Sequence, residues 1–168
     1  QTYNGGSDDG FVIKHDKDGN MLWARLLGGE SSDRPEGVGV DSGGNVYVGG
    51  HTWGSIDGYT KSGTLDGIVA KYDANGNKLW SRQVGGGQVI FQGAAVDSSG
   101  NAYFGGLLSG TLDGKSSGSS GVSAAIVKYD SGGNRLGTEI LCSYGSNKFW
   151  GMAADSGSVY AAGEIGSS

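Results

Sequence analysis

The sequence predicts an all-β protein made of three copies of a repeat of about 57 residues, each with four short antiparallel strands. Three observations support this prediction. Glycine supplies 36 of the 168 residues, and a glycine inside a helix costs roughly 1 kcal/mol relative to alanine, so helices are disfavoured. Related segments recur at a constant interval along the chain. Turns rich in Asn and Gly separate the apolar runs, as they do in β-hairpins.

The repeat is visible in two sequence markers. The first begins with Asp, contains Gly-Asn-x-Leu and recurs at intervals of 57 residues, at 16–23, 73–80 and 130–137. The second begins with Asp-Ser and carries a tyrosine, and it recurs at 41–50, 97–106 and, one residue shorter, 155–163. We therefore expect a single region, 1–168, with repeats at approximately 1–57, 58–114 and 115–168.

The middle repeat shows the expected elements in order. An apolar run with β-branched residues, a Trp-bearing segment, a segment of small residues and a final Tyr-containing segment predict strands at 67–73, 78–84, 93–97 and 101–105. The turns between them contain Asn and Gly, which tolerate positive φ. Four evenly spaced strands joined by hairpins are typical of sandwiches, barrels and propellers.

The apolar runs favour a propeller among these folds. They are continuous rather than alternating, at 11–13, 68–70 and 125–127, which indicates strands covered on both faces. The small-residue strand suits a crowded centre where sheets converge, and the Trp-bearing strand suits a wide outer rim. A β-trefoil, also three copies of four strands, is the alternative, although its strands face one core and should alternate.

Residues 66–80 and 37–50 carry a resemblance to a known family, as does the linker 54–58. They resemble the bacterial SBBP repeat, a family of predicted β-propellers. The resemblance implies a propeller with the small-residue strand innermost, and a secreted or surface protein without a common catalytic site. The third copy departs from the pattern, because Gly137 replaces the tryptophan and 122–124 replaces the Leu-Asp-Gly entry.

The resemblance also implies how the repeats divide into blades. Residues 1–30 would form two outer strands, residues 148–168 two inner strands, and the chain between them two complete blades. Propellers typically have four to eight blades, so we expect either an excerpt of a longer polypeptide, which we favour, or copies joined head to tail in an oligomeric ring or filament.

Charge and composition exclude some partners. The chain has a net charge of −5 and lacks a cluster of Lys and Arg, so a nucleic-acid surface is not expected. It lacks a run of 18 apolar residues, so membrane insertion is not expected. Eight Tyr, four Phe and four Trp indicate a packed core despite the high glycine content.

The sequence offers few groups for catalysis, and we expect no enzyme, no catalytic residue and no cofactor. The two histidines occupy unrelated positions, with His15 aligned to Tyr72 in a packing position. Cys142 has no histidine at a matching position and is interpreted as a free thiol. The Gly-Asn-x-Leu-Trp pattern also resembles quinoprotein propellers, so a fragment of such an enzyme is a second alternative function.

Acidic residues in the linkers suggest calcium as the one possible metal. Oxygen-rich loops of an extracellular protein can hold calcium, which makes Asp57, Asp66 and Asp113 the candidates. The turn 16–20 begins like a calcium loop but lacks the glutamate at loop position 12, and we interpret it as a plain turn.

Lysine recurs inside the apolar strand, at Lys14, Lys71 and Lys128. A buried ammonium group needs a partner, and the recurring aspartates are the obvious choice. We therefore predict structural ion pairs between blades, formed by these lysines with Asp41, Asp97 and Asp155.

The function that these observations favour is a non-enzymatic scaffold, structural or for protein interaction, in an extracellular or cell-surface protein. Its expected partners are other blades of the same longer chain or copies of itself, with a protein or glycan partner as a further possibility. The alternative is a carbohydrate-binding module, in which the linker aromatics Trp53 and Tyr59 stack on a sugar ring.

Overall fold

The protein is built from β-strands alone in the part that the computed structural model describes, residues 8–118, 121–142 and 147–166. The strands are β1 (Gly10–His15), β2 (Met21–Leu27), β3 (Asp33–Val40), β4 (Val46–Thr52), β5 (Asp66–Tyr72), β6 (Lys78–Val84), β7 (Gly87–Val96), β8 (Ala102–Leu112), β9 (Lys115–Ser116), β10 (Ser123–Tyr129), β11 (Arg135–Cys142), β12 (Asn147–Ala154) and β13 (Val159–Ile165). No helix long and apolar enough to cross a membrane occurs among these residues.

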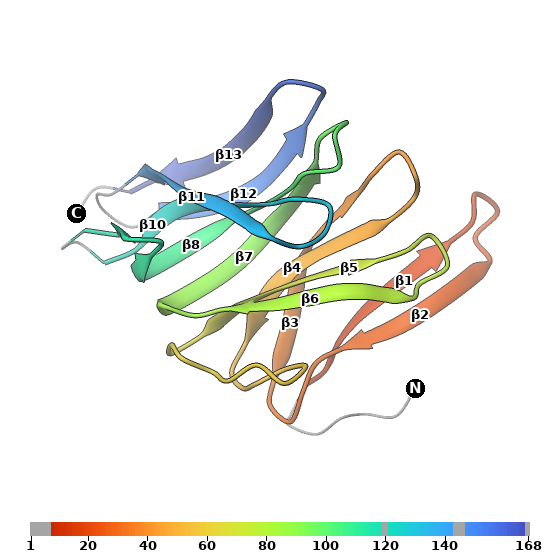
Figure 1. Cartoon of the computed structure of the whole chain (residues 1–168), viewed down its shortest axis with the longest axis horizontal. Coiled ribbons are helices and arrows are strands. Elements are labelled where there is room, and N and C mark those ends of the chain that lie inside the picture. Colours follow the sequence, from red (N-terminus) through yellow and green to blue (C-terminus); the bar gives the residue numbers. More distant parts are fainter. Residues whose placement is uncertain (1–7, 119–120, 143–146, 167–168) are drawn as a thin grey trace.

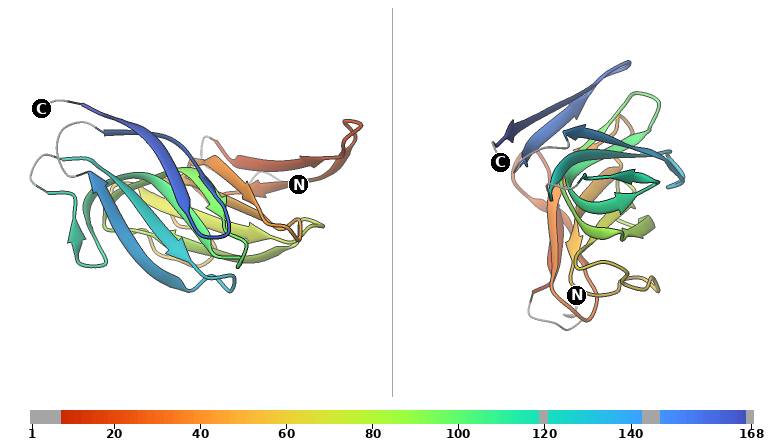
Figure 2. Two further views of the ribbon diagram at one scale, coloured as in Figure 1. Left: turned by 90° about the horizontal axis from the view of Figure 1, so that it is seen from above. Right: turned by 90° about the vertical axis from the view of Figure 1, so that its left-hand side faces the viewer.

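The strands form four antiparallel sheets. Two interior sheets have the orders β3-β4-β5-β6 and β7-β8-β10-β11, and the short β9 pairs with β8 in the second. The remaining strands form the two-stranded sheets β1-β2 and β12-β13. The sheets stand in a row, with β1-β2 at one end and β12-β13 at the other (Figures 1 and 2).

The strands β3, β7 and β12 lie where neighbouring sheets approach one another most closely. β3 packs against β7, and β7 packs against β12. Glycine makes this approach possible, since a Cβ on Gly37 would lie 2.7 Å from the backbone of Gly93. The small-residue strands β3, β7 and β12 therefore lie where these three sheets approach one another most closely.

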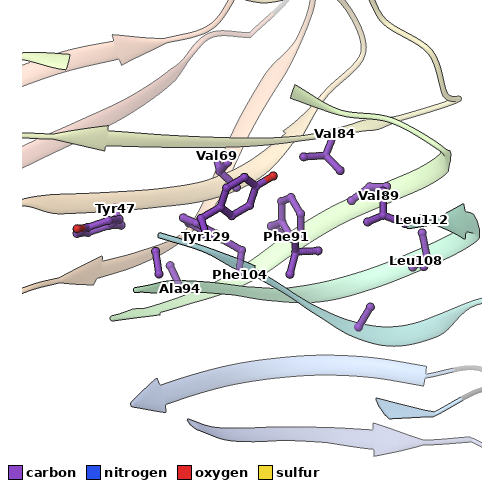
Figure 3. Packing of buried hydrophobic residues seen from close by; sticks show 13 residues of the cluster. Tyr47, Val69, Val84, Val89, Phe91, Ala94, Phe104, Leu108, Leu112 and Tyr129 are labelled. Atoms are coloured by element: carbon purple, nitrogen blue, oxygen red, sulfur yellow. The ribbon is translucent and has the colours of Figure 1, made fainter. Parts of the chain in front are cut away.

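Two apolar clusters fill the spaces between sheets. One joins the β3–β6 sheet to the β7–β11 sheet around Phe91, Phe104 and Tyr129 (Figure 3). The other joins β1 and β2 to β4 and β5 around Trp23 and Tyr72. Within β5, Val69 belongs to the first cluster and Ile68 to the second, which explains why the apolar run is continuous. Burial on both faces favours the propeller pattern over the trefoil alternative.

The third and fourth strands of the middle repeat are longer than the sequence predicts. They were expected at 93–97 and 101–105, whereas β7 begins at Gly87 and β8 ends at Leu112. The additional residues pair with one another, from Gly87 opposite Gly110 to Phe91 opposite Gly106. They include the apolar run Val89–Phe91, in which Val89 and Phe91 are buried, so β7 and β8 extend the core as well as the backbone pairing.

Candidate functional site

The recurring aspartates organise the hairpin turns. Asp41 accepts hydrogen bonds from the backbone N–H of Gly43 and Asn45, both at 2.9 Å, and from the Asn45 side chain at 2.8 Å. Asp97 does the same in the next sheet, and Asp16, Asp73 and Asp130 repeat the pattern in the other hairpins. Their carboxylates are therefore held by their own turns, and in the turn 16–20 Asp16 accepts from the backbone N–H groups of Asp18 and Asn20.

The predicted lysine–aspartate ion pairs are not formed. Nζ of Lys14 donates to the carbonyl oxygen of Ala74 at 2.9 Å, and Nζ of Lys71 to that of Ser131 at 3.2 Å. Each lysine thus reaches the turn of the next sheet instead of a carboxylate. Among the residues with described side chains, no salt bridge joins Lys14, Lys71 or Lys128 to Asp41, Asp97 or Asp155.

In each of the two interior sheets, a tyrosine stands between the lysine and the aspartate. The ammonium group of Lys71 lies 4.8 Å from the centre of the Tyr47 ring, and the Tyr47 hydroxyl donates to Asp41 at 3.2 Å. These residues belong to one sheet, because Tyr47 is directly opposite Lys71 in the β4–β5 pair. The direct ion pair fails because the aromatic ring separates the two charges.

The same arrangement of lysine, tyrosine and aspartate occurs in the β7–β11 sheet. The Tyr103 hydroxyl donates to Asp97 at 3.0 Å, and Lys128 lies 5.0 Å from the centre of the Tyr103 ring. Interaction with the Tyr103 hydroxyl raises the pKa of Lys128 above its ordinary value. In β12-β13, Tyr160 donates to Asp155 at 2.9 Å.

The calcium candidates are engaged by donor groups of the protein. Asp57 forms a salt bridge of 2.6 Å with Lys78, and Asp113 forms one of 2.6 Å with Arg135. The two aspartates are equivalent, and each is followed by glycine and adopts a positive φ, 49° and 51°. Each carboxylate thus joins a linker to the last long strand of its own sheet.

Asp66 is completely buried and accepts hydrogen bonds from the linker that precedes it. Its carboxylate accepts hydrogen bonds from the backbone N–H groups of Ser62 and Gly63 at 2.9 and 2.7 Å and from the Gln83 side chain at 2.8 Å. Among the described residues, no group of three or more His, Cys, Asp or Glu side chains is arranged to hold a metal.

The two linker aromatics lie in different surroundings. Trp53 is exposed, with the His51 ring centre 4.6 Å from its own on one side and the Arg34 guanidinium 5.0 Å from its ring centre. Tyr59 is also exposed, but its hydroxyl donates to the Ser81 carbonyl oxygen at 3.2 Å. Trp53, unlike Tyr59, therefore belongs to a cluster of polar side chains.

We call this group the Trp53 cluster: Asp33, Arg34, Glu36, His51 and Trp53. It lies at the paired ends of β3 and β4, where Arg34 is directly opposite His51. Nδ1 of His51, which is buried, lies 3.0 Å from a carboxylate oxygen of Glu36. The register of the β3–β4 pair shifts at this point, and Glu36 is the bulged residue, so the bulge sets the direction of its side chain.

Asp33 is the most deeply buried member of the Trp53 cluster. One carboxylate oxygen accepts a hydrogen bond of 2.7 Å from the backbone N–H of Gly29, while the other has no hydrogen-bond partner among the described residues. Burial raises the pKa of Asp33 above its ordinary value, and hydrogen bonds from Thr52 and Gly29 oppose that shift. An open hollow of about 530 Å³, lined by residues 8–11 and 33–36, adjoins it.

The Trp53 cluster is absent from the neighbouring sheet. The registers place Val89 and Leu108 where Asp33 and Thr52 pair, and Ile90 and Leu107 where Arg34 and His51 pair. Glu36 and Trp53, the remaining members of the cluster, correspond to Gln92 and Ser109. The sequence predictions included Trp53 but missed Asp33, Arg34, Glu36 and His51. A position-by-position comparison of the repeats would have revealed them.

The arrangement is suited to binding. A carboxylate, an imidazole, a guanidinium and an exposed indole lie on two adjacent strands, which hold them in fixed relative positions. Cys142, predicted to be a free thiol, ends β11, and its side chain lies outside the described part of the structure.

Antiparallel sheets with a repeated turn, stacked in a row, define an all-β repeat protein. Residues 22–57 match the model of the SBBP family, described as a beta-propeller repeat, which confirms the resemblance predicted from the sequence.

Two curated proteins are similar to the chain. Regulatory protein FlaEY of Caulobacter vibrioides is 31% identical over 118 residues, which cover 65% of this chain and 12% of that protein. An uncharacterized WD repeat-containing protein of Acanthamoeba polyphaga mimivirus is 32% identical over 101 residues, covering 52% of this chain and 7% of that protein. The similarity thus spans a small part of each relative.

Proposed function

We propose that the chain is a β-propeller segment that acts as a non-catalytic scaffold and binds a protein partner through the Trp53 cluster. In this proposal the stacked sheets are blades. The β3–β6 and β7–β11 sheets are complete blades, and β1-β2 and β12-β13 are an outer and an inner half-blade. The repeat-family match and the close packing of the inner strands support the propeller.

One observation carries the binding role. The same buried position holds the Asp33–Thr52 pair in one sheet and the Val89–Leu108 pair in the next. Because the apolar pair builds the same backbone, the fold does not require a carboxylate there. Burying a charged group costs free energy, so a buried carboxylate beside an open hollow is better explained by recognition than by stability.

The exposed members of the cluster are the kinds of residue that dominate protein interfaces. Tryptophan and arginine are enriched among residues that contribute most to binding. Here Arg34 of β3 lies over the Trp53 ring, and the ring of His51, near the end of β4, lies 4.6 Å from it. The pair therefore presents a preorganised surface, which reduces the entropy lost when a partner binds.

Affinity capture with the immobilised chain tests this role. We expect the wild type to retain a protein that Trp53→Ala and Glu36→Ala lose. Leu79→Ala should retain it, because Leu79 is an exposed residue of β6 outside the cluster. Equal retention by all four proteins would contradict the proposed site.

A glycan array run with the same variants distinguishes the carbohydrate-binding alternative. An exposed indole flanked by a guanidinium can also stack on a sugar. Glycan binding by the wild type that Trp53→Ala abolishes would replace the protein partner with a carbohydrate. An extracellular or cell-surface location remains part of the proposal, and labelling of intact cells with an antibody to the chain would test it.

A further inference from the structure

One asparagine in the turn between β5 and β6 differs from the other asparagines of the protein. The described residues include seven asparagines. Six of them donate a hydrogen bond from the side-chain amide at 2.7–2.9 Å: Asn20, Asn45, Asn77, Asn101, Asn134 and Asn147. The seventh, Asn75, is exposed, and its side-chain amide forms no hydrogen bond with the described residues. The Asn75 amide is therefore the one that the described structure leaves unrestrained.

Asn75 is also the one of these seven asparagines that a glycine follows. Each of the other six is followed by a residue with a side chain, whereas Asn75 precedes Gly76. The backbone nitrogen that follows an asparagine can attack the side-chain carbonyl carbon and close a five-membered ring. A Cβ on the attacking residue hinders that ring closure, and glycine has none. Sequence and hydrogen bonding therefore single out the same asparagine.

The combination of asparagine and glycine occurs in this turn of the middle repeat and not in the equivalent turns. The residue equivalent to Asn75 is Asp18 in the first repeat and Gly132 in the third, each also followed by glycine. All three turns close with the same hydrogen bond, in which the first aspartate accepts from the backbone N–H four residues later. The turn therefore forms without asparagine at this position.

An arginine of the preceding sheet contacts the peptide group that would react. Ring closure requires that the Gly76 N–H lose its proton, which places negative charge on the carbonyl oxygen of Asn75. Nη2 of Arg25 donates to that oxygen at 3.4 Å, and its Nε donates to the carbonyl oxygen of Gly76. A fixed cation beside a developing anion stabilises it. The Gly76 N–H itself donates to the Asp73 carbonyl oxygen at 2.9 Å, so a bond within the turn has to open first.

We propose that Asn75 is a site of spontaneous deamidation, in which water replaces the side-chain amide. The nitrogen of Gly76 attacks Cγ of Asn75, and the new C–N bond closes a succinimide ring. The bond between Cγ and Nδ2 then breaks, and the amide nitrogen leaves as ammonia with the proton lost from Gly76. The reaction consumes no oxidant or reductant, and water is its co-reactant in the second step.

Water opens the succinimide ring in one of two ways. Addition at Cγ breaks its bond to the Gly76 nitrogen, which leaves aspartate with the original main chain. Addition at the backbone carbonyl carbon of residue 75 breaks the bond of that carbon to the same nitrogen, which leaves isoaspartate. The main chain of isoaspartate runs through Cγ and is one methylene longer. Each product carries a new carboxylate two residues from Asp73.

The reacting turn is also where the β1-β2 sheet contacts the β3–β6 sheet (Figure 1). Just before the reacting residue, the Ala74 carbonyl oxygen accepts hydrogen bonds from Trp23 at 3.1 Å and from Lys14 at 2.9 Å. Just after it, a Cβ on Gly76 would lie 2.7 Å from the Trp23 ring. An added methylene moves Gly76 relative to Ala74, so both contacts with Trp23 cannot persist. Isoaspartate formation therefore weakens the attachment between the two sheets.

Ageing of the folded chain tests the site. We expect isoaspartate and aspartate to accumulate at position 75, faster at mildly alkaline than at neutral pH, because the Gly76 N–H must lose a proton. Trypsin releases residues 72–78, which contain Asn75 and Asn77, and fragmentation of this peptide locates the change. Asn4, also followed by glycine, lies outside the described residues and is measured in a separate peptide, 1–14. Survival of the Asn75 amide for as long as that of Asn77 would overturn the proposal.

Two variants copy the equivalent turns and serve as controls. Asn75→Gly reproduces the third repeat, in which a Cβ on Gly133 would lie 2.7 Å from the Trp80 ring, as one on Gly76 would from Trp23. We expect this variant to keep the far-ultraviolet spectrum of the wild type, and it has no amide to lose at position 75. Asn75→Asp reproduces the first repeat and the aspartate product, so it separates the added charge from the longer main chain.

The melting temperature measures the effect on the attachment between the sheets. We expect the isoaspartate form, isolated by chromatography from aged wild type, to melt below fresh wild type, with fresh Asn75→Asp between the two. Aged Asn75→Gly should melt as it does when fresh. An isoaspartate form that melts with fresh wild type would overturn the effect on the attachment. An equal loss in aged Asn75→Gly would also contradict it, because the cause would then lie elsewhere in the chain.

Discussion

Trp23 and Ala74 connect two neighbouring sheets through one hydrogen bond. The indole Nε1 of Trp23 donates to the carbonyl oxygen of Ala74 at 3.1 Å, and Lys14 donates to the same oxygen. Trp80 and Ser131 repeat the contact, also at 3.1 Å, between the next two sheets. The two turns 73–77 and 130–134 are thus both tight turns and the points where the preceding sheet is attached.

Because Trp23 packs on the turn that contains Gly76, alanine substitutions at the equivalent glycines Gly19 and Gly76 should lower the free energy of unfolding by different amounts. Gly19 and Gly76 have φ values of 87° and 80°, so alanine at either position is strained by about 1 kcal/mol or more. A Cβ at Gly76 would also lie 2.7 Å from the Trp23 ring, whereas none of the surrounding atoms is within 4 Å at Gly19. We expect Gly76→Ala to lower the free energy of unfolding by about 1–3 kcal/mol more than Gly19→Ala, measured by urea denaturation. Equal losses would contradict the packing of Trp23 on the turn.

Two buried tyrosines should respond in opposite ways to loss of the hydroxyl group. The Tyr47 hydroxyl donates to Asp41, whereas the Tyr72 hydroxyl is buried without a hydrogen-bond partner among the described residues. Burial raises the pKa of Tyr72 to about 12. We expect Tyr47→Phe to lower the free energy of unfolding by about 1 kcal/mol and Tyr72→Phe to leave it unchanged or raise it. Thermal unfolding of both variants measures these changes. If Tyr72→Phe loses as much unfolding free energy as Tyr47→Phe, the Tyr72 hydroxyl has a hydrogen-bond partner after all.

The repeated part of the fold could be predicted because each copy carries the same physical signals. The turn aspartates, the Gly-Asn pairs and the apolar run that forms β5 depend on local sequence, and they recur at a regular interval. The lysine partners could not be predicted in this way. Lys71 reaches Ser131, 60 residues away, and nothing local to either residue indicates that a backbone carbonyl accepts the bond.

The candidate site was missed for the opposite reason. Its residues break the repeat, and a search for what recurs passes over them. His51 stands where the next sheet has Leu107, and only the β3–β4 and β7–β8 registers show that the two positions correspond. In a repeat protein, positions where one copy is polar and the next is apolar are therefore informative about function.

The linker aspartates should stabilise the protein without calcium. Asp57 accepts from Lys78 and Ser81, so Asp57→Ala removes both interactions from a partly exposed site. We expect the variant to lose about 1 kcal/mol of unfolding free energy, typical of such pairs, equally in calcium and in chelator. Asp113→Ala, the equivalent change beside Arg135, is the matched comparison. A calcium-dependent rise in the melting temperature of the wild type that either variant abolishes would contradict this assignment.

Two aspartates should make opposite contributions to the pH dependence of stability. Hydrogen bonds from the side chain and backbone of Asn77 hold the pKa of Asp73 below its ordinary value of 3.8, whereas burial raises the pKa of Asp33 above that value. As the pH falls below 3.8, the unfolded chain protonates Asp73 before the folded protein does, so this part of the stability is lost.

The raised pKa of Asp33 has the opposite effect on the pH dependence of stability. The folded protein takes up a proton at Asp33 before the unfolded chain does, so this contribution to stability rises as the pH falls through the folded pKa toward 3.8. Urea denaturation from neutral pH to below 3.8 measures both slopes. We expect Asp33→Asn to reduce the rise above 3.8 and leave the fall below it, and Asp73→Asn to do the reverse. If Asp33→Asn flattens only the acidic slope, the Asp33 carboxylate is not held in a desolvated position, and the argument that it serves recognition at the cost of stability loses its basis.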